Sequence, residues 1–69
     1  MYAHVIHNAA HTRRFTITAT SSAGWEVREE EDSQIIKSRR YDDWHRVERA
    51  RLTFAHAAAG LRAAGWEDA

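Results

Sequence analysis

Apolar and polar residues alternate in two segments of the first half of the chain. Residues 15–20 alternate apolar residues with threonine, and residues 25–30 begin by alternating tryptophan and valine with charged residues. A period of two predicts β-strands that bury one face and expose the other. Residues 34–39 predict a third strand with one of two adjacent isoleucines buried, and residues 2–7 are a less regular fourth candidate. The intervening turns are short, which favours an antiparallel meander.

The last third of the chain predicts one long amphipathic helix from about Asp42 to Ala64. Large apolar residues recur every seven positions, and alanines follow them three positions later. The two sets are Val47, Phe54 and Leu61, and Ala50, Ala57 and Ala64. This spacing places both sets at the a and d positions of a heptad, on one side of a helix. We expect this stripe to be buried against the sheet.

Both ends of the predicted helix carry sequence signals. Asp42 is a favourable N-cap residue, because its carboxylate can accept a hydrogen bond from a free amide of the first turn. At the other end, Gly65 is placed to adopt the left-handed conformation beyond the last turn. Leu61 and Trp66 then become the hydrophobic pair of a Schellman ending.

Together these elements predict a single α+β domain over residues 1–69. It consists of an antiparallel β-meander of three or four strands, followed by one long C-terminal α-helix packed across one face. This element order resembles that of small strand-then-helix modules that bind single-stranded nucleic acid as dimers, such as PUR-type and Whirly-type domains. The resemblance concerns topology alone, so it assigns no site residue in this chain.

Size and composition limit how such a domain can be stabilised. A chain of 69 residues has a thin core, and domains of this size often depend on a disulfide, a metal or a partner subunit. The absence of cysteine excludes disulfides and thiolate zinc sites. Ten basic residues balance ten acidic ones, which argues against non-specific binding to nucleic acid. No apolar run is long enough to span a membrane, so we expect a cytoplasmic location.

The helix stripe predicts self-association. A helix over the predicted range is about 30 Å long, whereas strands of six residues are about 20 Å long, so the helix should extend beyond the sheet. A homodimer would cover the exposed end. The residues expected in that interface are Leu61, Ala64, Trp66, Ala57 and Arg51. The alternative is that the N-terminal segment folds over the helix end. For Arg51, which lies beside the stripe, the separate alternative is that its stem packs against the protein while its head group extends into solvent, toward Glu48.

Candidate catalytic and metal-binding groups are sparse. His4, His7 and His11 lie close together in the sequence, but odd spacing on a strand places His4 and His7 on opposite faces. The acidic run 29–32 spans a predicted turn, where like charges are solvated. No phosphate-binding loop or nucleophile motif is present. We therefore expect no catalytic residue, no metal site and no cofactor.

Two functions follow as hypotheses. The first is a non-enzymatic interaction or structural module that self-associates through its C-terminal helix. The alternative is a nucleic-acid-binding dimer that uses the polar outer face of the sheet. The basic residues assigned to that alternative are Arg28, Lys37, Arg39 and Arg14. Glutamates at neighbouring strand positions can neutralise this field by cross-strand pairing.

Overall fold

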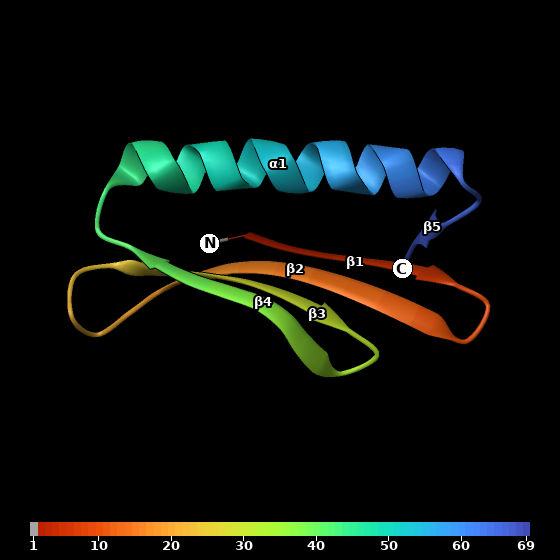
Figure 1. The fold of residues 1–69 in the computed structure, drawn as a ribbon, viewed down its shortest axis with the longest axis horizontal. Helices are drawn as coiled ribbons and strands as arrows, with labels where there is room; N and C mark the ends of the chain where they lie inside the picture. The colour runs from red at the N-terminus through yellow and green to blue at the C-terminus, as the bar shows by residue number, and fades with distance from the viewer. Residues whose placement is uncertain (1) are drawn as a thin grey trace.

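The computed structural model describes residues 2–69 as an antiparallel sheet with one helix lying along one of its faces (Figure 1). The elements are β1 (Tyr2–Asn8), β2 (His11–Ala19), β3 (Trp25–Glu31), β4 (Gln34–Tyr41), α1 (Trp44–Ala63) and β5 (Glu67–Asp68). The strand order in the sheet is β4-β3-β2-β1-β5. The predicted α+β meander is confirmed, but residues 2–69 form five strands rather than three or four. The fifth, β5, has only two residues, which is too short for any periodic signal.

The hydrophobic core lies between the sheet and α1. Its buried members are Ile6, Phe15, Ile17 and Val27 from the strands and Val47, Phe54 and Ala58 from the helix. At its centre the rings of Phe15 and Phe54 lie 4.9 Å apart between centroids. Val47 and Phe54 are thus buried as predicted, whereas Ala57 and Ala64 are exposed and Ala58 takes the expected place of Ala57. The reason is that a straight helix has 3.6 residues per turn, so its buried side drifts away from a strict seven-residue repeat.

The helix ends are defined by local hydrogen bonds. Its N-cap is Asp43 rather than Asp42, and the Asp43 carboxylate accepts a hydrogen bond from the amide of His45 at 3.0 Å. At the other end Gly65 has a φ of 104°. The Trp66 amide donates to the Leu61 carbonyl at 2.9 Å, as the Schellman ending requires. This prediction is therefore confirmed, and the reversal directs the chain back toward β1.

The β3–β4 hairpin contains a β-bulge. Lys37 lies opposite Glu29 and Ile35 lies opposite Glu30, so Ile36 is an extra residue in β4. The two isoleucines are 56% and 50% exposed, and the prediction that one of them joins the core is wrong. Figure 1 shows the reason, since the tip of this hairpin curves away from α1.

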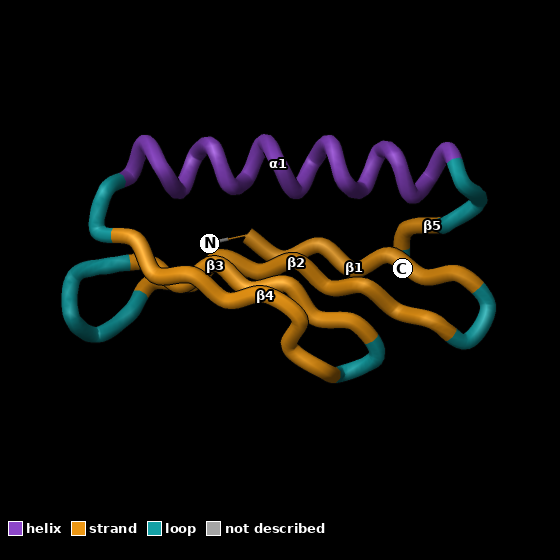
Figure 2. Tube along the Cα trace, viewed as in Figure 1, coloured by secondary structure: helices purple, strands orange, loops and turns teal. Residues whose placement is uncertain are grey.

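The predicted extension of the helix beyond the sheet is also wrong. β2 has nine residues and α1 has 20, so both are about 30 Å long. Figure 2 shows α1 running along the length of the strands in a separate layer. Leu61 and Trp66 pack against the core of their own chain. Helix α1 lacks the apolar character that crossing a membrane would require.

Candidate functional site

Helix α1 leaves a groove open beside the edge strand β4. The groove has a volume of about 440 Å³, and β3, β4 and α1 line it. Its lining residues are Val27, Glu29, Lys37, Arg39 and Tyr41 from the strands and Arg46, Arg49, Ala50, Thr53 and Phe54 from the helix. Val27 and Phe54 belong to the buried core and form an apolar floor. We call this feature the basic groove, after its four cations Lys37, Arg39, Arg46 and Arg49.

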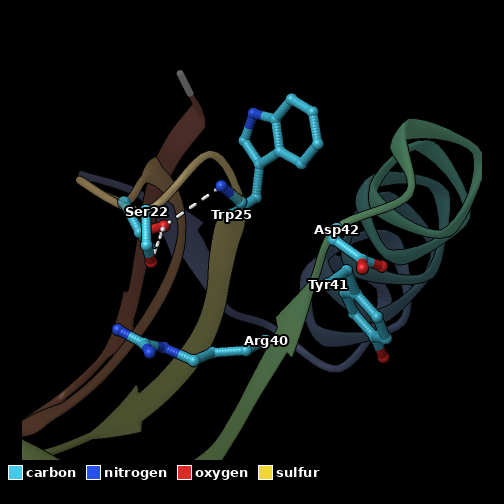
Figure 3. A pocket seen from close by; sticks show the side chains of 7 residues that line it. Ser22, Trp25, Arg40, Tyr41 and Asp42 are labelled. Atoms are coloured by element: carbon cyan, nitrogen blue, oxygen red, sulfur yellow. Dashed lines mark hydrogen bonds between the residues drawn. The ribbon is translucent and has the colours of Figure 1, made fainter.

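Strand register explains why two of the cations face the helix. Lys37 lies opposite Glu29 and Arg39 lies opposite Val27, and residues directly opposite each other share one face of a sheet. Val27 is buried beneath α1, so Arg39 lies on the helix side. Figure 3 shows the alternation at the end of β4, where the side chains of Arg40 and Tyr41 point to opposite sides of the strand.

The helix contributes the other wall through side-chain spacing. Arg46, Arg49 and Thr53 are separated by three and four positions, which places them along one side of α1. Thr53 donates a hydrogen bond from its hydroxyl to the Arg49 carbonyl at 3.0 Å. Arg46 and Arg49 thus line the groove on its helix side, and both residues are exposed, so their guanidinium groups are accessible to an anion.

The basic groove carries uncompensated positive charge. Within residues 2–69, none of its four cations has a carboxylate oxygen within 4.0 Å. Glu29 is the only acidic residue in the lining, and it is already paired with Arg13, which also lies 3.5 Å from Glu31. A concave site with an excess of one charge sign over a low-dielectric floor concentrates its field and attracts ions of the opposite sign.

The outer face of the sheet is different, because its central cation is neutralised. Arg28 lies 3.1 Å from Glu26 and 3.7 Å from Glu30. The hydrogen bond from Arg28 lowers the pKa of Glu26, and Ser38 donates a further bond to the same carboxylate at 3.2 Å. Arg28 is therefore held in a local network and offers little free charge to a partner.

The residues predicted to bind nucleic acid are thus divided between two faces. Arg14 lies opposite Glu30, and like Arg28 it is on the outer face, whereas Lys37 and Arg39 are on the helix side. The prediction of one basic outer face is wrong because the bulge at Ile36 shifts the alternation by one residue. Arg46 and Arg49 were not among the residues predicted to form a site. Their spacing of three positions places both on one side of the helix. That spacing indicates a groove only once the register of β4 shows that Lys37 and Arg39 face the same space.

The residues predicted to self-associate lie in two places. Leu61 and Trp66 are half-buried at the C-terminal end of α1, where Ala57 and Ala64 are exposed nearby in sequence. Arg51 instead borders a second cavity of about 190 Å³ near the start of the helix. The aromatic lining of that cavity is Tyr2, Trp25 and Trp44. Arg51 forms no ion pair with Glu48, which accepts a hydrogen bond from the indole of Trp44 at 3.1 Å. A homodimer stays a prediction.

A third hollow, of about 330 Å³, lies between the β2–β3 turn and the connection from β4 to α1 (Figure 3). Its hydroxyl groups serve the turn itself, since the Thr20 hydroxyl accepts a hydrogen bond from the Gly24 amide at 3.2 Å. The side chain of Arg40 is the single cation in its lining, and Asp42 also lines it. This hollow therefore lacks the charge excess of the basic groove.

Two of the five histidines, His4 and His11, each contact a different aspartate. His4 lies 2.7 Å from Asp68, and His11 lies 3.0 Å from Asp32. Within the part of the chain that the structure describes, no group of three or more histidine, cysteine, aspartate or glutamate side chains is arranged to hold a metal ion. Comparison with protein-family models, with curated proteins and with solved structures finds no match for this chain.

Proposed function

We propose that this protein is a non-enzymatic interaction module that binds an anionic partner in the basic groove. The observation that carries this proposal is the set of four cations without a carboxylate partner around an apolar floor. Like charges held close together repel one another, and a bound anion relieves that repulsion. Arginine also presents paired N–H donors that match carboxylate and phosphate groups.

The chemistry of the lining favours binding over catalysis. General acid–base catalysis needs a titratable group within reach of the reacting atoms. The only carboxylate that lines the groove, Glu29, is 14% exposed in its side chain and is held by Arg13. The remaining polar groups are cations, the Thr53 hydroxyl and the Tyr41 phenol, which are suited to holding an anion in place.

The experiment compares two pairs of substitutions that remove the same charge. Arg46→Gln/Arg49→Gln changes the groove, and Arg14→Gln/Arg40→Gln changes the outer face. Fluorescence anisotropy at low salt measures the affinity for a labelled poly-glutamate peptide and for a labelled oligothymidylate. We expect the groove pair to weaken binding of the preferred probe by about tenfold or more, because charge-assisted hydrogen bonds contribute roughly 1.5–3 kcal/mol each.

The outer-face pair should change that affinity by less than about twofold, since exposed charges outside the site act only through screened fields. Equal losses of affinity in the two double variants would mean that binding depends on the net charge of the protein and not on the groove. Failure of both probes to bind the unmodified protein at low salt would remove the proposal.

A further inference from the structure

The free edge of the sheet borders the basic groove. β4 is the last strand on its side, and no other strand within residues 2–69 pairs with its outer edge. From Gln34 to Arg40 every residue of β4 is exposed. An edge strand presents unpaired backbone amides and carbonyls, which are a template for an added strand.

A strand added to β4 would place its side chains into the groove at every second position. Successive side chains of a strand alternate between the two faces of a sheet. Side chains of the added strand that point to the helix side would lie beside Lys37 and Arg39 of β4. Arg46 and Arg49 would approach them from α1. Those positions require acidic side chains, because four cations without partners surround them.

We propose that the partner is an acidic polypeptide segment that pairs with β4 as an additional strand and directs carboxylates at alternate positions into the basic groove. This inference rests on the proposed function and specifies its ligand. The bulge at Ile36 ends regular pairing on that side, so the footprint on β4 is residues 37–41. The expected recognition pattern is two or three acidic residues separated by single residues of any uncharged type.

A second copy of this chain does not fit the same edge. Pairing β4 with another β4 would bring Lys37 and Arg39 close to their own counterparts, and like charges on neighbouring strands are destabilising. An alternative explanation is that the charged residues of the edge strand have no ligand and act only to prevent association with other strands. That role accounts for the cations of β4, but it does not account for Arg46 and Arg49, which lie on the helix.

A single-stranded nucleic acid fits less well than an acidic peptide. Proteins that bind single strands combine a basic groove with aromatic rings on which bases stack. The aromatic side chains lining this groove are Phe54, which is 5% exposed, and the half-buried Tyr41. The groove therefore offers at most one stacking surface, whereas its open strand edge suits a polypeptide backbone.

The test places the decisive changes in the probe, so that the fold of the protein is not altered. The first peptide has about nine residues, with glutamates at alternate positions between threonines and valines, which is long enough to form one strand. The second has the same composition with its glutamates in one block. The third repeats the first with N-methyl groups on alternate backbone amides, which removes its ability to pair on one edge.

We expect the alternating peptide to bind about tenfold more tightly than either control. The block peptide cannot direct all its carboxylates to one face, and the N-methylated peptide loses backbone hydrogen bonds. Hydrogen exchange should also slow at those amides of residues 37–41 that point away from β3 when the alternating peptide is bound. The double substitution Lys37→Gln/Arg39→Gln should weaken binding of this peptide, and Arg14→Gln/Arg40→Gln should not.

The outcomes separate this inference from the proposed function. Equal affinity for the three peptides, together with a loss in Arg46→Gln/Arg49→Gln, would refute strand addition and leave the basic groove as an anion site. Tighter binding of oligothymidylate than of the alternating peptide would identify nucleic acid as the partner and overturn the inference. Affinity that is unaffected by Arg46→Gln/Arg49→Gln would refute both proposals.

Discussion

Arg28 at the centre of the outer face and the four cations of the basic groove differ in whether acidic residues compensate their charge. On the outer face, Arg28 lies between Glu26 and Glu30, whereas on the helix side the four cations of the basic groove have no acidic partner. The same strand supplies both sides, because Arg40 and Arg39 alternate along β4. A net charge of zero therefore conceals an uneven distribution. The outer face carries two glutamates for its three arginines, Arg14, Arg28 and Arg40, whereas the only acidic residue lining the groove within residues 2–69 is already held by Arg13. Paired surface charges contribute little to stability, whereas unpaired charges in a groove remain available to a ligand.

The largest expected effect comes from removing the floor that the groove shares with the core. Phe54→Ala should lower the free energy of unfolding by roughly 3–5 kcal/mol, because it leaves a cavity against Phe15. Urea unfolding measures this loss. Leu52→Ala is the control on the same helix, since Leu52 is 60% exposed, and it should cost less than about 1 kcal/mol. A loss below about 1 kcal/mol for Phe54→Ala would show that this side of α1 does not face the sheet.

The next effect concerns the end of the helix that carries one wall of the groove. Gly65→Ala should destabilise the protein by about 1–2 kcal/mol, because a φ of 104° is strained for a residue with a Cβ atom. Gly60→Ala is the matched control, since Gly60 lies inside α1 and an added Cβ meets nothing within 4 Å. This control should stabilise the helix by about 0.5–1 kcal/mol. Melting temperatures that move in the same direction for both variants would contradict the described helix ending.

Removing the acidic partners of Arg28 would test whether an arginine on the outer face can bind an anion. Glu26→Gln/Glu30→Gln removes both carboxylates from Arg28 and should create a second, weaker site for anionic probes. The unfolding free energy should change by less than about 1 kcal/mol, because these ion pairs are near the surface. Titration calorimetry with the poly-glutamate probe counts the sites. An unchanged stoichiometry and affinity would show that freeing Arg28 on the flat outer face is not enough to bind an anion.

A homodimer through the C-terminal half of α1 would place two grooves on one assembly. Ala57 is exposed, so Ala57→Asp should cost less than about 1 kcal/mol in a monomer. In a dimer, the same change would bury an unpaired charge and shift sedimentation toward a monomer. It would also remove any dependence of the melting temperature on protein concentration. A single species of 8.0 kDa before and after the substitution would refute the predicted dimer.

The smallest effect is the pH dependence of the pair His11 and Asp32 at the end of the sheet. The hydrogen bond with Asp32 raises the pKa of His11, and the same bond lowers the pKa of Asp32. The contribution of His11 to stability is therefore complete below about pH 6.5 and is lost as the pH rises through its folded pKa. The contribution of Asp32 to stability is present above about pH 4 and is lost as the pH falls through the pKa of Asp32 in the folded protein.

Melting temperatures measured from pH 3 to pH 9 should fall on both the acid and the alkaline side. The substitution His11→Gln should reduce the fall on the alkaline side. Arg62→Gln serves as a control, because it changes an exposed ion pair with Asp68 and leaves His11 untouched. An alkaline limb that persists in His11→Gln would assign the pH dependence to another group. Between about pH 6 and pH 9 the charge of the basic groove should not change, since no histidine among residues 2–69 lines it.

The sequence by itself determined the elements whose signals are local. Alternation in residues 15–20 and 25–30 specified two strands and their buried faces, and Gly65 with Leu61 and Trp66 specified the end of the helix. Each of these depends on neighbours within one strand or one helical turn, so the chain's own periodicity is sufficient.

Only the tertiary structure decided which residues form the site. The bulge at Ile36 arises in the pairing of β4 with β3, and it moves Lys37 and Arg39 to the helix side. The burial of Ala58 in the expected place of Ala57 likewise follows from laying a straight helix on the sheet. A one-residue shift between strands reverses the face of every later side chain, and no pattern within β4 reveals it. The basic groove therefore exists only once register and helix placement are known.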